Sequence, residues 1–241
     1  MSAADRAAAI GLDEPLAVSD LDDSEVEAWL HRLLSEPDIS EIEASIRSWR
    51  ELLGTWWALA DRVGRVLIAL GHAWASGEIS ILEEHVISER LRRALLRCAE
   101  DYAPLVRAPR ALLATAAGED HDLGLVLCEL VLREAGWTVL WCGRRSPIDS
   151  LDAYVRTGGI QLVALSASSY ATDTVSLRRE LETLVEACEL GGCGLVVGGA
   201  GLWPEPPPRG VTRFHTFAEM VAWLADRGEV GPTVGGPPTS S

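Results

Sequence analysis

Four stretches with apolar side chains at helical spacing fill residues 22–106 of the chain. The second stretch opens at Asp38, the third ends at Gly77, and the fourth opens at a capping box formed by Ser80 and Glu83. Apolar residues at intervals of three and four give each helix one face to bury. Four amphipathic helices joined by short connections predict an antiparallel bundle.

A different pattern follows, in which short apolar runs alternate with helical stretches over residues 107–228. Such alternation predicts a parallel, doubly wound sheet of the Rossmann or flavodoxin-like type. The fold class is therefore α/β, with an N-terminal four-helix bundle followed by a five-stranded parallel sheet. The predicted strands lie at 111–117, 138–142, 162–166, 195–198 and 211–214, and the predicted helices at 123–135, 148–156, 174–190 and 217–226.

The two ends of the chain have neither pattern. Residues 1–21 are rich in alanine and acidic side chains, and residues 229–241 are rich in Gly, Pro, Ser and Thr, so both predict disorder. The opening residues also lack the apolar core of a signal peptide, and no apolar run approaches the roughly 18 residues of a membrane span. We therefore expect a cytoplasmic protein without a membrane segment.

The charged residues of the chain exclude several classes of function. The formal net charge is −15, and every basic residue is arginine, so a lysine Schiff base and a P-loop lysine are excluded. Binding to a nucleic acid backbone depends on neutralising phosphates, which an acidic protein without a basic stripe does poorly. We expect no direct binding to DNA.

Three motifs fall at the ends of three predicted strands. The first runs from Glu119 through His121 and Asp122 to Gly124. Forty-one residues then separate Gly124 from Ser166, which ends the third strand and is followed by Ser168, and the pair Gly198–Gly199 ends the fourth strand. The carboxyl ends of parallel strands meet at one edge of a sheet, so these motifs share one site.

The series resembles the cobalamin-binding motif of the methionine synthase and methylmalonyl-CoA mutase type, in which a histidine replaces the cofactor's own base beneath cobalt. The resemblance implies that His121 is the lower ligand of cobalt. Glu119, two residues away, can accept the other ring N–H and fix the tautomer. The further residues assigned to cofactor binding are Asp122, Gly124, Ser166, Ser168, Gly198 and Gly199.

A second signal lies in the predicted bundle, where nine residues separate Trp74 from Glu84 and His85. A short turn through Gly77 places the end of one helix beside the start of the next, so the indole, the carboxylate and the imidazole lie on adjoining surfaces. A core tryptophan with a solvated Glu-His pair is the alternative interpretation.

Together with the cobalamin motif, this spacing resembles the CarH-type adenosylcobalamin photoreceptors. The resemblance implies that Trp74, Glu84 and His85 enclose the upper ligand, that light breaks the cobalt–carbon bond, and that an oligomer then dissociates. The gene-repressing members carry an N-terminal MerR-type DNA-binding domain, for which residues before the bundle leave no room. The known members also place a histidine directly after the tryptophan, where this chain has Ala75.

We therefore expect a light-sensing, adenosylcobalamin-binding regulatory protein, not an enzyme, that acts through a protein partner such as a transcription regulator or through its oligomeric state. A dimer or larger assembly is expected in the dark. After illumination, water or His85 would fill the upper site, and we favour His85 because a buried imidazole near an open metal site seldom stays uncoordinated. The alternative function is a corrinoid carrier of methyl groups for a methyltransferase, with methylcobalamin as the cofactor. A mutase subunit is a third and weaker alternative, because the radical chemistry of a mutase needs a barrel domain that this chain lacks.

Overall fold

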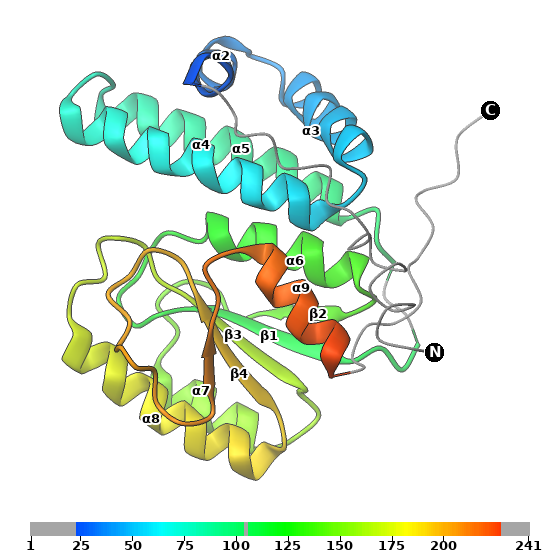
Figure 1. Cartoon of the computed structure of the whole chain (residues 1–241), viewed down its shortest axis with the longest axis vertical. Coiled ribbons are helices and arrows are strands. Elements are labelled where there is room, and N and C mark those ends of the chain that lie inside the picture. The colour runs from blue at the N-terminus through cyan, green and yellow to red at the C-terminus, as the bar shows by residue number, and fades with distance from the viewer. Residues whose placement is uncertain (1–22, 104–105, 228–241) are drawn as a thin grey trace.

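The computed structural model describes residues 23–103 and 106–227. The disorder predicted for residues 1–21 and 229–241 falls outside these ranges. In the described part, helices lie over a sheet in stacked layers (Figure 1). The first helices are α2 (Asp23–Ser35), α3 (Ile39–Leu53), α4 (Trp56–Ser76) and α5 (Ile81–Ala99).

The bundle helices begin and end at the predicted signals. Asp38 accepts a hydrogen bond from the backbone N–H of Ser40 at the start of α3, and Ser80 and Glu83 form a complete capping box at the start of α5. Gly77 ends α4 with a positive φ of 80°, a conformation that glycine adopts without the steric cost of a Cβ. The turn at Gly77 therefore folds α5 back along α4.

The second half of the chain forms a five-stranded parallel sheet in the order β2-β1-β3-β4-β5. This order is doubly wound with its switch point at β1 and β3, which confirms the predicted fold class. Its elements are β1 (Arg110–Thr115), α6 (Leu123–Glu134), β2 (Thr138–Trp141), α7 (Ile148–Arg156), β3 (Leu162–Ser166), α8 (Thr174–Gly191), β4 (Gly194–Gly198), β5 (Val211–Arg213) and α9 (Phe217–Asp226).

The bundle and one face of the sheet share a single hydrophobic core. Helices α6 and α9 lie between the sheet and the pair α4–α5, whereas α7 and α8 cover the opposite face (Figure 1). Leu59 of α4, Leu95 of α5 and Leu130 of α6 are fully buried in the shared core. Removing apolar surface from water contributes roughly 25 cal/mol per Å². The burial of these side chains therefore holds the bundle against the sheet.

Two carboxylates fix one end of the bundle to the sheet layer. Glu134, at the end of α6, accepts hydrogen bonds from Arg50 at 2.7 Å and from the backbone N–H of Trp56 at 2.8 Å. Asp61 of α4 accepts from the backbone N–H of Phe217 at 2.6 Å, at the start of α9. Both contacts lie in the half of α4 remote from Gly77.

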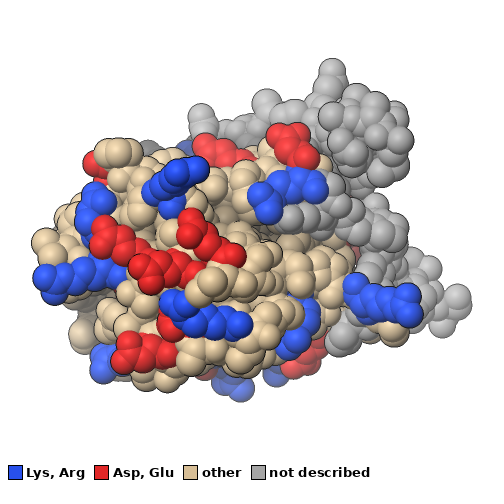
Figure 2. Space-filling model, turned by 90° about the horizontal axis from the view of Figure 1, so that it is seen from below, with Lys and Arg blue, Asp and Glu red and all other residues tan. Residues whose placement is uncertain are grey.

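The surface on the side of α7 and α8 carries charges of both signs. Figure 2 shows arginine and acidic side chains interspersed on this face without a continuous basic stripe. On α7, for example, Arg156 forms an ion pair with Asp152 at 2.8 Å. Separately, none of the helices in the described ranges is long and apolar enough to cross a membrane.

Candidate functional site

The loop between β1 and α6 holds the first motif at the carboxyl edge of the sheet. Thr115, at the end of β1, is fully buried, and its hydroxyl donates to the backbone oxygen of Glu119 at 2.9 Å. The same hydroxyl accepts from the backbone N–H of Arg145 at 3.1 Å, in the loop after β2. Thr115 therefore fixes the shape of the motif loop against its neighbour.

Glu180 of α8 supports the same loop from the opposite face of the sheet. Its buried carboxylate accepts from the backbone N–H of Ala117, at 3.2 and 3.1 Å to its two oxygens. Burial raises the pKa of Glu180, and the hydrogen bond from Ala117 opposes that rise only in part. The loop that leads to His121 is thus held by side chains on both sides.

Glu119 is the centre of a dense hydrogen-bond network. Its side chain is 3% exposed. One carboxylate oxygen accepts from the backbone N–H of His121 at 2.8 Å, and the other accepts from the backbone N–H and the hydroxyl of Ser168 at 2.8 and 2.6 Å. Burial raises the pKa of Glu119, but the hydrogen bonds from Ser168 and His121 outweigh burial and bring the pKa to about 2. Glu119 is therefore an anion at neutral pH.

The imidazole of His121 is held at one nitrogen and open at the other. Its Nδ1 atom lies 2.5 Å from the Glu119 carboxylate and 3.3 Å from the hydroxyl of Ser168. A carboxylate at Nδ1 favours the tautomer that leaves Nε2 as a free electron-pair donor. The side chain is 53% exposed, so Nε2 is available to a ligand.

Small residues let the loops after β1, β3 and β4 pack closely. A Cβ at Gly199 would lie 2.3 Å from the backbone oxygen of Ala167, and one at Gly124 would lie 3.2 Å from the hydroxyl of Ser166. Gly199 also has a φ of +85°. Gly198 is less restricted, with 3.8 Å from its ideal Cβ to the nearest atom outside its neighbours. The structure thus brings both serines and all three predicted glycines to one edge.

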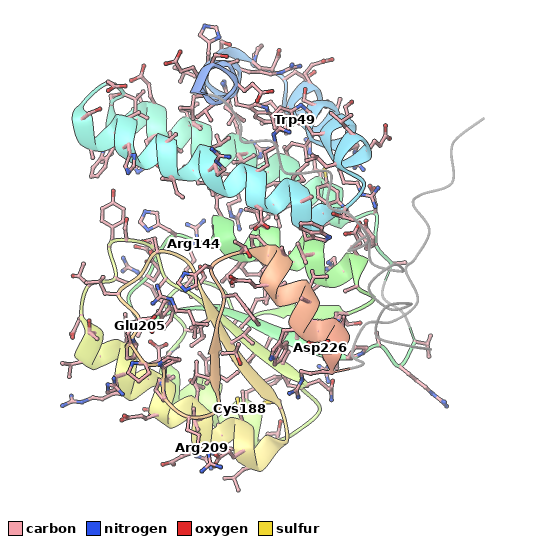
Figure 3. All side chains as sticks on the ribbon, viewed as in Figure 1. Trp49, Arg144, Cys188, Glu205, Arg209 and Asp226 are labelled. Carbon is pink, nitrogen blue, oxygen red and sulfur yellow. The ribbon has the colours of Figure 1, made fainter. Side chains whose placement is uncertain are left out.

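The side chain of Asp122 forms ion pairs with two arginines, one of which belongs to the bundle. Its side chain is 5% exposed and forms ion pairs with Arg92 of α5 and with Arg144, each with Nε 3.0 Å from the carboxylate. Figure 3 shows Arg144 at the boundary between the bundle and the sheet layer. In this structure Asp122 therefore links the bundle to the motif loop, directly after His121.

The bundle residues of the second motif differ in their exposure to solvent. Trp74 and Glu84 are partly buried, and the hydroxyl of Ser88 donates to Glu84 at 2.7 Å. The imidazole of His85 is 67% exposed, with its Nε2 atom 3.6 Å from Glu84. The expectation that His85 is a buried imidazole is wrong, because its position on α5 turns the side chain toward solvent.

Tyr170 joins the bundle to the motif loop, and the sequence analysis missed it. Its ring stacks on the imidazole of His121, with centroids 5.0 Å apart, and meets Trp74 edge to face at 5.8 Å. Burial and the nearby charge of Glu84 raise the pKa of the Tyr170 hydroxyl. Its place two residues after Ser168 was the signal that could have identified it.

Comparisons with known proteins agree with this architecture. No protein-family model matches the chain. The HTH-type transcriptional repressor CarH of Myxococcus xanthus is 30% identical over 128 residues, which cover 51% of this chain and 42% of that repressor. The repressor CarA of the same organism is 30% identical over 123 residues, with the same shares of each chain. The chain therefore spans less than half the length of these relatives.

A solved structure shares the fold across nearly the whole chain. The Methanosarcina barkeri monomethylamine corrinoid protein superposes with a TM-score of 0.62 at 14% identity, covering 85% of this chain and 99% of that one. At this identity the likeness shows a common fold. The sequence relationship is closer, and it shows that this protein is homologous to the repressors CarH and CarA over about half of its length.

Proposed function

We propose that this protein binds a cobalamin through His121 at the carboxyl edge of the sheet. The observation that carries the proposal is the chain of contacts from Ser168 through Glu119 to Nδ1 of His121, which leaves Nε2 open. A corrinoid protein with the same fold supports it, and so does homology to CarH and CarA.

The residues present fit such a cofactor. Among the described residues, no group of three or more His, Cys, Asp or Glu side chains gathers to hold a bare metal ion. A single imidazole, oriented by a carboxylate, suits a metal that arrives with most of its ligands already in place. A corrin ring supplies such a set around cobalt.

Different residues of the chain would hold different parts of the cofactor. His121 would be the lower ligand, with Glu119 holding its tautomer and Ser168 holding Glu119. The close-packed loops at Gly124, Ser166 and Gly199 would receive the nucleotide tail, while Trp74 and Glu84 would cover the upper side. When bound, adenosylcobalamin supplies a cobalt–carbon bond that light can break.

We further propose that the protein is a light-responsive regulator and not an enzyme. The names of its homologues are those of transcriptional repressors, and the partly buried Trp74 and Glu84 of the bundle would enclose a bulky upper ligand. The signal would leave through a protein partner or a change of oligomeric state. We expect at least a dimer in the dark with cofactor bound.

A carrier of methyl groups between methyltransferases is the second candidate. The likeness to the monomethylamine corrinoid protein favours it, because that chain is matched over 99% of its length. The two functions differ in their response to light and in the upper ligand. A carrier would exchange a methyl group with an enzyme partner in the dark.

Cofactor binding is tested by titrating the purified protein with methylcobalamin in the dark and recording the absorption spectrum. The parent and a His31→Ala control, which alters an exposed histidine on α2, should show a base-off spectrum with histidine bound. His121→Ala should lose that spectrum. If the variant keeps it, His121 is not the ligand.

Light sensing is tested on protein loaded with adenosylcobalamin. Green light should change the spectrum and the mass measured by light scattering, whereas a dark control should change in neither. A stable mass and spectrum under light, with methyl transfer to a thiol acceptor in the dark, would favour the carrier instead.

A further inference from the structure

Tyr170 contacts residues of both predicted halves of the site. Its ring lies nearly parallel to the imidazole of His121, at an interplanar angle of 15°, and meets the indole of Trp74 at 67°. Stacked and edge-to-face arrangements at such distances are those that aromatic rings prefer. Tyr170 is therefore in contact with the sheet-borne histidine and with the bundle at once.

The backbone around Tyr170 is fixed although its side chain is exposed. The hydroxyl of Ser168, which donates to Glu119, also accepts from the backbone N–H of Tyr170 at 3.3 Å. The next residue, Ala171, donates to the backbone oxygen of Ser168 at 3.0 Å and accepts from the backbone N–H of Leu202 at 2.9 Å. The loop thus presents the ring of Tyr170 at a defined place beside His121.

The hydrogen bond to Glu119 does not by itself fix the imidazole. A ring held at Nδ1 can still tilt about the direction of that hydrogen bond, and a tilt changes the direction in which Nε2 points. A second ring stacked against one face blocks the tilt. Tyr170 supplies that ring.

We propose that Tyr170 is a positioning residue that sets the plane of the His121 imidazole and so directs Nε2 toward the cobalt of a bound cobalamin. This inference rests on the proposed function. It requires an aromatic ring at position 170 but not the hydroxyl. Phenylalanine should therefore substitute for tyrosine, whereas leucine, an apolar side chain without a ring, should not.

The first measurement needs no cofactor. In NMR spectra of the purified protein, the ring protons of His121 should carry the shift that a stacked aromatic ring induces. Tyr170→Phe should keep that shift and Tyr170→Leu should abolish it. Tyr154→Leu is the matched control, because Tyr154 is an exposed tyrosine on α7. Equal thermal melting of the two leucine variants would show that Tyr170→Leu is folded.

The second measurement is the dissociation constant for methylcobalamin, with the histidine-bound spectrum as the readout. Loss of one stacked pair should weaken binding by roughly 2- to 12-fold in Tyr170→Leu, while Tyr170→Phe and Tyr154→Leu stay at the parent value. Unchanged ring shifts, or unchanged affinity in Tyr170→Leu, would overturn the inference. A parent that binds no cobalamin at all would instead refute the proposed function.

Discussion

The Nδ1 atom of His121 lies 2.5 Å from the Oε1 atom of Glu119, and the carboxylate is almost wholly buried beneath the imidazole. Glu119→Gln should therefore weaken cobalamin binding by about 10- to 100-fold, the usual cost of removing such a supporting group. The amide has no charge to offer Nδ1. Titration with methylcobalamin measures the effect, with the exposed Glu182→Gln on α8 as control. Equal affinities in the two variants would contradict the role given to Glu119.

The low pKa of Glu119 also makes a prediction about stability and pH. The carboxyl group has an ordinary pKa of 4.5 and a folded pKa of about 2, so its contribution to folding is fully present above about pH 4.5 and is lost as the pH falls toward 2. Urea unfolding of the parent and Glu119→Gln should differ by up to about 3 kcal/mol at pH 6. The difference should shrink at pH 3.5. If the difference in unfolding free energy between the parent and Glu119→Gln is larger at pH 3.5 than at pH 6, the carboxylate is not stabilised by its hydrogen-bond donors.

The fold and the lower half of the site could be predicted from the sequence because their signals are local. The capping residues Asp38 and Ser80 mark helix starts by their own side chains, and the strand-end positions of His121 and Ser166 follow from the alternation of elements. In a parallel sheet that alternation already determines which loops share an edge.

Other features depend on contacts between distant segments, which a single sequence does not record. Tyr170 meets Trp74 across 95 intervening residues, and Arg92 reaches Asp122 from another helix. The exposure of His85 was missed for a related reason. Two adjacent residues on a helix point in directions about 100° apart, so the half-buried position of Glu84 leaves His85 outside.

The link between Asp61 and the start of α9 should contribute to stability. Asp61→Ala removes the acceptor of two backbone N–H groups, those of Phe217 and Ala218, and should lower the free energy of unfolding by about 0.5–2 kcal/mol, as for the loss of a helix cap. The control is Asp226→Ala, at the other end of the same helix (labelled in Figure 3), where a carboxylate is unfavourable to the helix dipole. That change should be neutral or slightly stabilising. Equal losses at both ends would argue against a specific cap by Asp61.

The last prediction concerns the coupling of the bundle to the motif loop through Arg92 and Asp122. Asp122 follows His121 directly and is buried, so it depends on its two arginine partners for neutralisation. Arg92→Met should destabilise the protein by about 1–3 kcal/mol, because Arg144 remains as one partner. Arg93→Met, at the exposed neighbouring position on α5, should change stability by less than about 0.5 kcal/mol.

A double-mutant cycle separates this contact from general effects of either change. The variants Arg92→Met, Asp122→Ala and their combination, measured by urea unfolding, should give a coupling energy of about 0.5–3 kcal/mol. A coupling near zero would mean that the two side chains contribute independently. Arg92 belongs to the bundle, and Asp122 belongs to the loop that carries His121. A positive coupling would therefore mean that a movement of α5 can affect the loop that holds His121.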